Sequence, residues 1–458
     1  MNITKNIIKH KKVQIISQSR FFKSNLIDEY QEDYGKFGLS HYHTSELFSV
    51  QELDSFSKIL KQVYPLSFGI PKTTIPLQHI LHSSDLFNIQ YQGTHKFLGE
   101  YSDKSKLKDS LQFIHVGGTN GKGSVCKKIE SALLLSGVKT GLYTSPHISS
   151  VRERILVDGH LINLRYFSDM LHKIYELNDK DIIKANCGHA FFLSALRYFE
   201  NQKVEIAVTE VGLGGEKCYT NIINPLLSVI TSIDYDHTHL LGNTKKEIAQ
   251  VKAGIIKQNT PCIIGMDADP KEVFLSKAKE CNSEIYFVGE NKETLARVEE
   301  EGVHNYLDYS YDEENKKTAR KTLHLLNKYY DESLLKGRLT EENIEKGILA
   351  KPSCRLENVI ESLGQNGVHR IVEVWNSSNE NSNKYNKVNL SHILSELLSK
   401  SRVKIFLDVA HNNHGLEKLL RQISREHPGF KIKIIYAVAK SKSIDDSIEI
   451  IKKYCDSV

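Results

Sequence analysis

The chain has 458 residues, of which 40% are hydrophobic and 26% charged, and its 61 basic against 56 acidic residues give a formal net charge of +5. This composition is typical of a globular protein and excludes a largely disordered chain. Since single cores stop growing at about 250–300 residues, we expect two domains. No apolar run reaches the roughly 20 residues of a membrane-spanning helix. The mild, well-mixed charge gives no reason to expect nucleic acid or a membrane as a partner.

The seven cysteines are scattered and form no C-x-x-C pair, which suits a reducing compartment and argues against a cysteine zinc site. Residues 1–27 depart from the even charge pattern, because six basic residues lie from Lys5 to Lys23 before the first acid, Asp28. We expect a cytoplasmic protein, with a mitochondrial transit peptide as the alternative, although the segment is richer in lysine than in arginine. Residues 1–60 form a weakly patterned basic extension.

From residue 113 onward, apolar strand-like runs alternate with helical patterns, which predicts an α/β fold with helices on a parallel sheet. In the first domain, 61–295, Val125, Ile129, Ala132 and Leu133 form a helical stripe that stops at Ser136. The expected strands of this domain are 113–116, 140–143, 204–208, 226–233 and 261–264.

A second, smaller Rossmann-like α/β domain is expected over residues 305–458. Strand-like runs at 403–407 and 432–436 flank a helix that ends before Pro428-Gly429. The weakly patterned stretch 289–310 is the expected junction between the domains. The Asn/Ser/Lys-rich stretch 376–389 is expected to be a surface insertion, because it cannot bury enough apolar surface to order itself.

The strongest motif is G-G-T-N-G-K-G-S at residues 117–124, between the first expected strand and its helix. Glycines let backbone amides approach phosphates, the helix N-terminus favours anions, Lys122 supplies a charge and the Ser124 hydroxyl can bind magnesium. The Walker pattern would need glycine at Val116 and a hydroxyl residue at Gly123, so this is a different phosphate-loop family. A glycine turn with an unrelated lysine is the less favoured interpretation.

Further candidates follow strands, at the sheet edge where open α/β proteins bind ligands. Glu210 follows 204–208 and can hold magnesium, and among Asp234-Tyr235-Asp236-His237 we favour His237 as a metal ligand. A lone acidic residue or histidine at a strand end more often has a structural role. Next to the phosphate loop, metal binding becomes the favoured interpretation for these residues.

Lys252 lies in a helix introduced by the capping box of Thr244 and Glu247, on one face between Ile248 and Ile255. Burial favours the neutral amine, which can take up carbon dioxide as a carbamate that then binds metal. The spacing by itself favours a lysine whose stem lies along apolar surface and whose charge reaches water.

Together these motifs resemble the folylpolyglutamate synthase and dihydrofolate synthase family, relatives of the Mur peptidoglycan ligases. The resemblance runs from about residue 68 to 444 and is strong at 113–155 and 204–256. It implies an ATP- and Mg²⁺-dependent ligase that phosphorylates a substrate carboxylate and transfers the acyl group to L-glutamate. The implied carboxylate substrate is dihydropteroate or a folate, and the implied state is a monomer.

The resemblance also implies roles for individual residues. Lys122, Lys252, His237 and Arg355 would carry the chemistry. The ATP-binding positions would be Gly118, Thr119, Asn120, Gly121, Lys122, Gly123, Ser124, Asn315, Arg355, Asp408 and His411. The magnesium positions would be Ser124, Ser145, Glu210, His237 and carbamylated Lys252. Ser145 lies in the second family motif, which continues to Glu153-Arg154-Ile155.

The chain departs from the family pattern in places. Cys218-Tyr219 stands where the family has Asp-Ala, Tyr311-Asp312 replaces a His-Gln pair, and the sequence ends at Val458, before several expected C-terminal elements. Two alternatives therefore stay open: a nucleotide-binding remnant without turnover, and a Mur-type ligase acting on a nucleotide-sugar peptide. Asn120 resembles the dihydrofolate synthase and bifunctional branch more than the polyglutamate-only branch.

Overall fold

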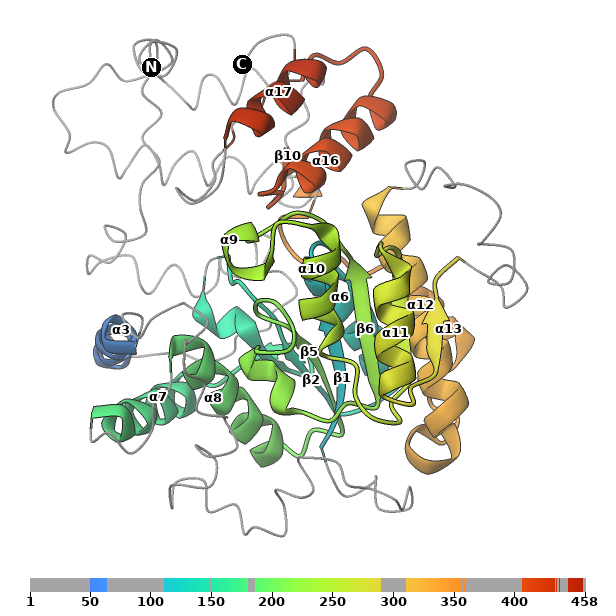
Figure 1. The fold of residues 1–458 in the computed structure, drawn as a ribbon. Coiled ribbons are helices and arrows are strands. Elements are labelled where there is room, and N and C mark those ends of the chain that lie inside the picture. The colour runs from blue at the N-terminus through green and yellow to red at the C-terminus, as the bar shows by residue number, and fades with distance from the viewer. Residues whose placement is uncertain are drawn as a thin grey trace, which may run out of the picture.

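The computed structural model describes residues 50–63, 111–148, 150–179, 186–289, 310–355, 357–358, 406–432, 434, 436 and 444–455. An eight-stranded sheet in the order β4-β3-β2-β5-β1-β6-β7-β8 forms its centre (Figure 1). Strands β2, β5, β1, β6, β7 and β8 run parallel, which confirms the predicted fold class. The strands of this sheet are β1 (Gln112–Gly117), β2 (Thr140–Tyr143), β3 (Ile155–Val157), β4 (His160–Leu161), β5 (Ile206–Glu210), β6 (Leu227–Ser232), β7 (Cys262–Asp267) and β8 (Ile285–Phe287).

One edge of the sheet is antiparallel, a feature that the sequence reasoning does not include. Strands β3 and β4 are joined by Asp158-Gly159, whose φ angles of 49° and 77° suit a two-residue hairpin turn. Strand β3 pairs antiparallel with β2, and Tyr143 lies opposite Ile155. The sheet is therefore mixed, with its parallel strands in the centre.

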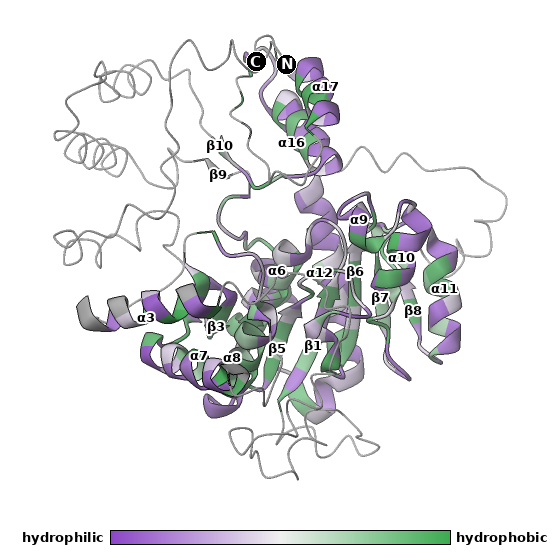
Figure 2. Cartoon of the chain, turned by 60° about the vertical axis from the view of Figure 1, so that its left-hand side comes forward, coloured by the Kyte–Doolittle hydropathy of each residue, from purple (hydrophilic) through white to green (hydrophobic). Residues whose placement is uncertain are grey.

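Helices cover both faces of the sheet, because alternate residues of a buried strand point to opposite faces. Ile114 packs with α6, α12 and α13, whereas Phe113 packs with α3, α7 and α8. Helices α10 and α11 extend the second layer around Ile230 and Ile264. Figure 2 shows hydrophobic residues along the strands and on the helix faces that meet them. These helices are α3 (Val50–Val63), α6 (Lys122–Leu135), α7 (Leu164–Asp179), α8 (Cys187–Asn201), α10 (Lys245–Ala253), α11 (Lys271–Glu280), α12 (Tyr311–Tyr330) and α13 (Glu341–Gly347).

The placement of α12 and α13 differs from the expected domain organisation. Ala319 and Leu323 of α12 are buried in the same cluster as Ala132 of α6. A Cβ on Gly347 would lie 2.4 Å from the Ala132 backbone, so α13 packs directly onto α6. Helices α12 and α13 therefore pack with the core of the first domain, although the second domain is expected from residue 305. The high charge of α12 conceals apolar positions that complete the first core.

The described C-terminal part consists of the antiparallel pair β9 (Glu357–Asn358) and β10 (Phe406–Leu407) and the helices α16 (Asn413–Glu426) and α17 (Asp445–Tyr454). Helix α16 lies where the sequence predicts it, and its Leu416 and Leu420 pack on α17. Ile432, Ile434 and Tyr436 pack against this pair, and these three described positions of the predicted strand 432–436 do not form a strand.

Several sequence expectations lie outside the described residues, namely the extension up to residue 49, the insertion at 376–389 and the junction at 290–309. Within the described segments, no helix is long and apolar enough to cross a membrane. Figure 1 shows α16 and α17 above the carboxyl ends of the central strands, on the side where α6 begins.

Candidate functional site

The loop between β1 and α6 turns sharply at two glycines. Gly118 and Gly121 have φ angles of 136° and 83°, a region that favours glycine. A Cβ on Gly118 would lie 2.0 Å from Thr231 Oγ1, and one on Gly121 would lie 2.3 Å from Asn315 Oδ1. Backbone conformation and close neighbours therefore both require glycine at these positions.

The carboxyl end of β6 supports the loop. Thr231 Oγ1 donates to the Asn120 carbonyl at 2.6 Å, and the Asn120 N–H donates to Ser232 Oγ at 2.9 Å. The Thr119 N–H donates to the Ser232 carbonyl at 2.8 Å. The sequence reasoning missed Thr231 and Ser232, although they end an expected strand, which is the signal used for the metal candidates.

Two lysine side chains meet at the loop from different elements. Lys122 is the first residue of α6, and its Nζ donates to the Thr119 carbonyl at 2.9 Å. Lys252 of α10 is buried, and its Nζ donates to the Gly118 carbonyl at 2.9 Å. Burial, with the positive charge of Lys122 as the second cause, lowers the pKa of Lys252 to about 7. A large share of Lys252 is therefore neutral near pH 7, the form that can take up carbon dioxide.

The capping box predicted for the helix of Lys252 is present. Thr244 Oγ1 accepts from the Glu247 N–H, and the Glu247 carboxylate accepts from the Thr244 N–H. The cap fixes the start of α10 and so the position of Lys252 two turns later.

Glu210 ends β5, and only 3% of its surface is exposed. Its Oε2 accepts from the Ser145 N–H at 2.8 Å, which holds the segment after β2 against the end of β5. Burial raises the pKa of Glu210, and the positive charge of Lys122 and the Ser145 hydrogen bond oppose that rise. The carboxylate faces Gly123, where a Cβ would lie 3.4 Å from Oε2.

The donors around Glu210 suit a hard cation. In the described part of the chain, no basic group lies within ion-pair distance of this buried carboxylate. Magnesium prefers carboxylate and hydroxyl oxygens of this kind, and Ser124 and Ser145 bring hydroxyls to the same pocket. The described residues include no cluster of three or more His, Cys, Asp or Glu side chains able to hold a metal. The predicted set relies instead on Glu210, His237, two hydroxyls and Lys252.

Asp236 and His237 follow β6 and both line the pocket. The His237 N–H donates to Asp236 Oδ1 at 2.7 Å, with His237 in the left-handed region at a φ of 50°. Asp236 Oδ2 lies 3.4 Å from His411 Nε2 and accepts from Asn412 Nδ2 at 3.4 Å. The sequence reasoning favours His237, whereas in the structure Asp236 also links this loop to the C-terminal part.

Residues from the second half of the chain lie opposite the phosphate loop. Asn315 is buried on α12 beside Gly121, and Arg355 lines the pocket. Asp408 Oδ2 accepts from the Tyr311 hydroxyl at 3.0 Å. The pKa of Tyr311 is raised by burial and by the Asp408 charge, so its hydroxyl keeps the proton that it donates. The departure from the family pattern at Tyr311 therefore supplies a contact within the pocket.

The other departure, Cys218-Tyr219, packs beside the pocket. A Cβ on Gly188 or Gly212 would lie 2.5 or 2.4 Å from atoms of Tyr219, so its side chain fits tightly against both glycines. The Tyr143 hydroxyl donates to the Tyr219 hydroxyl at 3.4 Å. The Tyr219 ring thus fills space next to the loop that follows Glu210.

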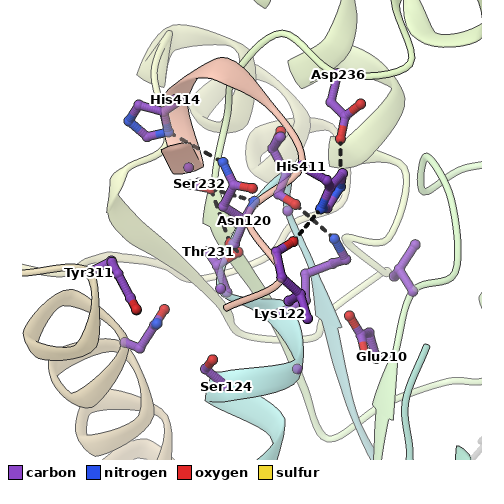
Figure 3. Close-up of a pocket in the computed structure, with 18 of the residues that line it drawn as sticks. Asn120, Lys122, Ser124, Glu210, Thr231, Ser232, Asp236, Tyr311, His411 and His414 are labelled. Carbon is purple, nitrogen blue, oxygen red and sulfur yellow. Dashed lines mark hydrogen bonds and ion pairs between the residues drawn. The ribbon is translucent and has the colours of Figure 1, made fainter. Parts of the chain in front are cut away.

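One pocket brings together every residue that the sequence selects, although the role of each residue stays a prediction. Figure 3 shows Lys122, Ser124, Glu210, Asp236 and His411 around it. The selected residues that line it are Gly118, Thr119, Asn120, Gly121, Lys122, Gly123, Ser124, Ser145, Glu210, His237, Lys252, Asn315, Arg355, Asp408 and His411. Lining residues that the sequence reasoning missed include Thr231, Ser232, Asp267, Glu314, His414 and Lys418.

Comparison with known proteins finds the families that the sequence motifs resemble, both among family models and among curated relatives. The Mur ligase middle domain model matches residues 116–326. A putative folylpolyglutamate synthase of Caenorhabditis elegans is 36% identical over 187 residues, which are 40% of this chain and 37% of that relative. A dihydrofolate synthase/folylpolyglutamate synthase of Haemophilus influenzae is 38% identical over 174 residues, which are 38% of each chain. The match thus spans well under half the length of these curated relatives.

A solved structure titled as a bifunctional folylpolyglutamate synthase/dihydrofolate synthase with Mn, AMPPNP and L-glutamate bound has the same fold. Its TM-score is 0.60 at 22% identity, covering 88% of this chain and 82% of that chain. The described fold is therefore shared with that synthase structure, and residues 116–326 are similar to the middle domain of Mur ligases. The curated relatives that match this chain are named as folylpolyglutamate synthases or as dihydrofolate synthase/folylpolyglutamate synthases.

Proposed function

We propose that this protein is an ATP-dependent ligase that joins L-glutamate to dihydropteroate, to a folate, or to both. The observation that carries the proposal is the single pocket in which the phosphate loop, Glu210 with Ser145, Lys252, and Arg355 with Asp408 meet. In the proposed reaction, ATP phosphorylates the substrate carboxylate, the glutamate amine attacks the acyl phosphate, and inorganic phosphate leaves.

The charges of this pocket suit phosphoryl transfer, a reaction in which enzymes act mainly by positioning and electrostatic stabilisation. Lys122 and the N-terminus of α6 bring positive charge to the phosphates of the nucleotide. Arg355 is proposed to approach the transferring group from the other side of the pocket. No general base is needed if the glutamate amine arrives neutral.

Magnesium would be held by Glu210, Ser124 and Ser145, with His237 and a carbamylated Lys252 as further ligands. When bound, it would neutralise charge on the transferring phosphoryl group. Lys252 is suited to carbamylation because it is buried with a pKa of about 7, and a carbamate would replace a buried amine by a negatively charged oxygen ligand. The support for these roles is the shared pocket and the family resemblance.

The proposed substrates are inferred from the names of the relatives and from the ligands in a related structure. The Haemophilus influenzae relative is named for both activities, and the bifunctional synthase structure holds L-glutamate and the ATP analogue AMPPNP. The finer choice between dihydropteroate and a folate is proposed from Asn120, which favours dihydropteroate or both. We also propose a monomer in the cytoplasm, with a mitochondrial location as the alternative.

The test is ATP-dependent incorporation of labelled L-glutamate by purified protein with magnesium and bicarbonate, with dihydropteroate and tetrahydrofolate in separate reactions. Incorporation with dihydropteroate alone defines a dihydrofolate synthase, and incorporation with both defines a bifunctional enzyme. Failure with both substrates, while ATP binds the wild type but not Lys122→Ala, rejects the ligase proposal in favour of a nucleotide-binding protein without turnover.

A further inference from the structure

Helix α16 contacts the sheet side of the molecule through polar side chains. Its apolar residues Leu416 and Leu420 face α17, so they are not available to pack against the sheet. The opposite side carries His414 and Lys418, which line the pocket together with residues that follow β6 and β7. Hydrogen bonds and ion pairs therefore attach this helix to the phosphate-loop part.

Lys418 makes the most buried of these contacts. Its Nζ lies 2.9 Å from Asp267 Oδ2 at the end of β7 and 2.8 Å from Glu314 Oε2 on α12. Only 12% of the side chains of Lys418 and Glu314 is exposed. One ammonium group thus lies between two carboxylates from two different elements. Because the three groups are largely buried, water screens the attraction between them less than it would at the surface.

His414 and Asn412 contact the phosphate loop and the two strand ends. His414 Nδ1 lies 3.3 Å from Asp234 Oδ2, and its Nε2 lies 3.1 Å from Asp267 Oδ2. Asn412 Nδ2 donates to Asn120 Oδ1 at 2.9 Å. Figure 3 shows His414 and Asn120 joined directly.

These contacts lie next to the residues that the second half contributes to the pocket. Asp408 and His411 come immediately before Asn412, the N-cap of α16, whose side chain accepts from the Gly415 N–H at 2.9 Å. Asn412 both caps α16 and contacts Asn120 of the phosphate loop. Because Asp408 and His411 lie in the segment that leads into this cap, a shift of α16 would move them relative to the phosphate loop.

We propose that Asn412, His414 and Lys418 are positioning residues that hold α16 on the phosphate-loop part and so align Asp408 and His411 over the bound nucleotide. The three side chains act through geometry and contribute no group to the reaction. Lys418 supplies the attraction, and His414 and Asn412 fix the register of the helix against Asp234 and Asn120.

The experiment compares Lys418→Met and His414→Gln with Arg421→Met. Arg421 is a matched control, because it lies on the same helix and its ion pair is with Glu417 of that helix. Spin labels at Lys279→Cys on α11 and Lys452→Cys on α17, both exposed, report the distance between the two parts. Cys354→Ser removes the one cysteine that is not buried. ATP affinity, and kcat and KM for ATP, are measured on the same full-length proteins without labels.

We expect Lys418→Met and His414→Gln to broaden the label distance distribution and to lower kcat by about tenfold to 100-fold, as small misplacements do. ATP affinity should fall by less than kcat does, since the phosphate loop itself is intact and only the alignment of Asp408 and His411 with the nucleotide is disturbed. Lys418→Arg keeps a positive charge between Asp267 and Glu314 and should give a narrower distribution than Lys418→Met. Arg421→Met should match the wild type.

The proposal would be overturned if Lys418→Met and His414→Gln both gave the same label distance distribution as Arg421→Met. It would also be overturned if these variants lost ATP affinity and kcat by equal factors. The kcat measurement rests on the proposed ligase function, whereas the distance measurement does not. A wild type without glutamate incorporation would therefore reject the function and still leave the positioning role decided by the label distances.

Discussion

Lys122 brings a full positive charge to the phosphate loop, and its only described hydrogen bond is to the Thr119 carbonyl within that loop. Lys122→Met should therefore lower ATP affinity by about tenfold to 100-fold, the range for loss of one charge-assisted hydrogen bond. Calorimetric titration with ATP measures this change. Lys139→Met is the control, because Lys139 pairs with Asp158 away from the pocket and should bind ATP like the wild type. Equal affinities for all three proteins would contradict the assignment.

His115 lies in β1 and is fully buried; its Nε2 contacts Thr220 Oγ1 at 2.9 Å, while Nδ1 has no hydrogen-bond partner among the described residues. Burial lowers the pKa of His115 to about 3, with Lys257 as the second cause. In the unfolded chain it titrates near 6.5, so protonation favours unfolding as the pH falls from about 6.5 toward 3. Each pH unit in that window costs about 1.4 kcal/mol of stability.

His115→Asn should therefore lose less stability on acidification than the wild type. Between pH 6.5 and 5.5 we expect the wild type to lose about 1 kcal/mol more than the variant. Urea unfolding at both pH values measures the difference. Parallel loss of stability in the two proteins would show that His115 is not kept neutral in the folded state.

At the scale of elements, one buried lysine joins α6 to the two helices that cover it. Lys128 Nζ lies 2.9 Å from Asp312 Oδ1 and donates to the Ile348 and Ala350 carbonyls at 2.8 and 2.9 Å. Lys128→Met leaves Asp312 and both carbonyls without this donor. We expect the free energy of unfolding to fall by about 3–5 kcal/mol, as when one partner of a buried pair is removed.

Chemical denaturation of Lys128→Met measures this loss, and Lys346→Met provides the control. Lys346 pairs with Glu342 on the surface of α13, with 62% and 73% of the side chains exposed, so its removal should cost less than about 1 kcal/mol. Adding Asp312→Leu to Lys128→Met should recover part of the loss. Similar stabilities for the two lysine variants would mean that the buried contact does not hold α12 and α13 on α6.

Elements with strong local signals could be predicted from the sequence, and those that depend on distant contacts could not. The strand and helix around the phosphate loop are confirmed, as is the capping box of α10, because glycines and caps act within a few residues. Helix α6 begins at Lys122, just before the predicted apolar stripe, since Gly121 in the left-handed region caps it. The core role of α12 was missed because its many charges outnumber its buried positions.

The same difference applies to the candidate site. The phosphate loop and strand-end residues could be selected because each is a local motif at a predictable sheet edge. Tyr311, Glu314 and Lys418 could not, since Tyr311 contacts Asp408, and Lys418 contacts both Glu314 and Asp267, all far away in the sequence. Only the folded chain brings these charges together.

At the scale of the whole molecule, the described residues form separate apolar cores joined by polar contacts. The sheet and its helices share buried clusters from Phe56 to Ile348, whereas α16 and α17 form their own small cluster. Between the two, the described contacts are mainly hydrogen bonds and ion pairs such as those of Lys418 and His414. Apolar burial provides most of the cooperativity of folding, so the two parts are expected to unfold in separate steps.

Scanning calorimetry should therefore show two transitions, and core variants should separate them. Leu420→Ala removes a side chain that is 1% exposed in the α16 and α17 cluster, and should lower the stability of one transition by about 2–5 kcal/mol. Leu133→Ala, in the fully buried face of α6, should act by a similar amount on the other transition. A single transition that both variants shift equally would contradict this, because it would mean that the polar contacts of α16 join the two cores into one cooperative unit.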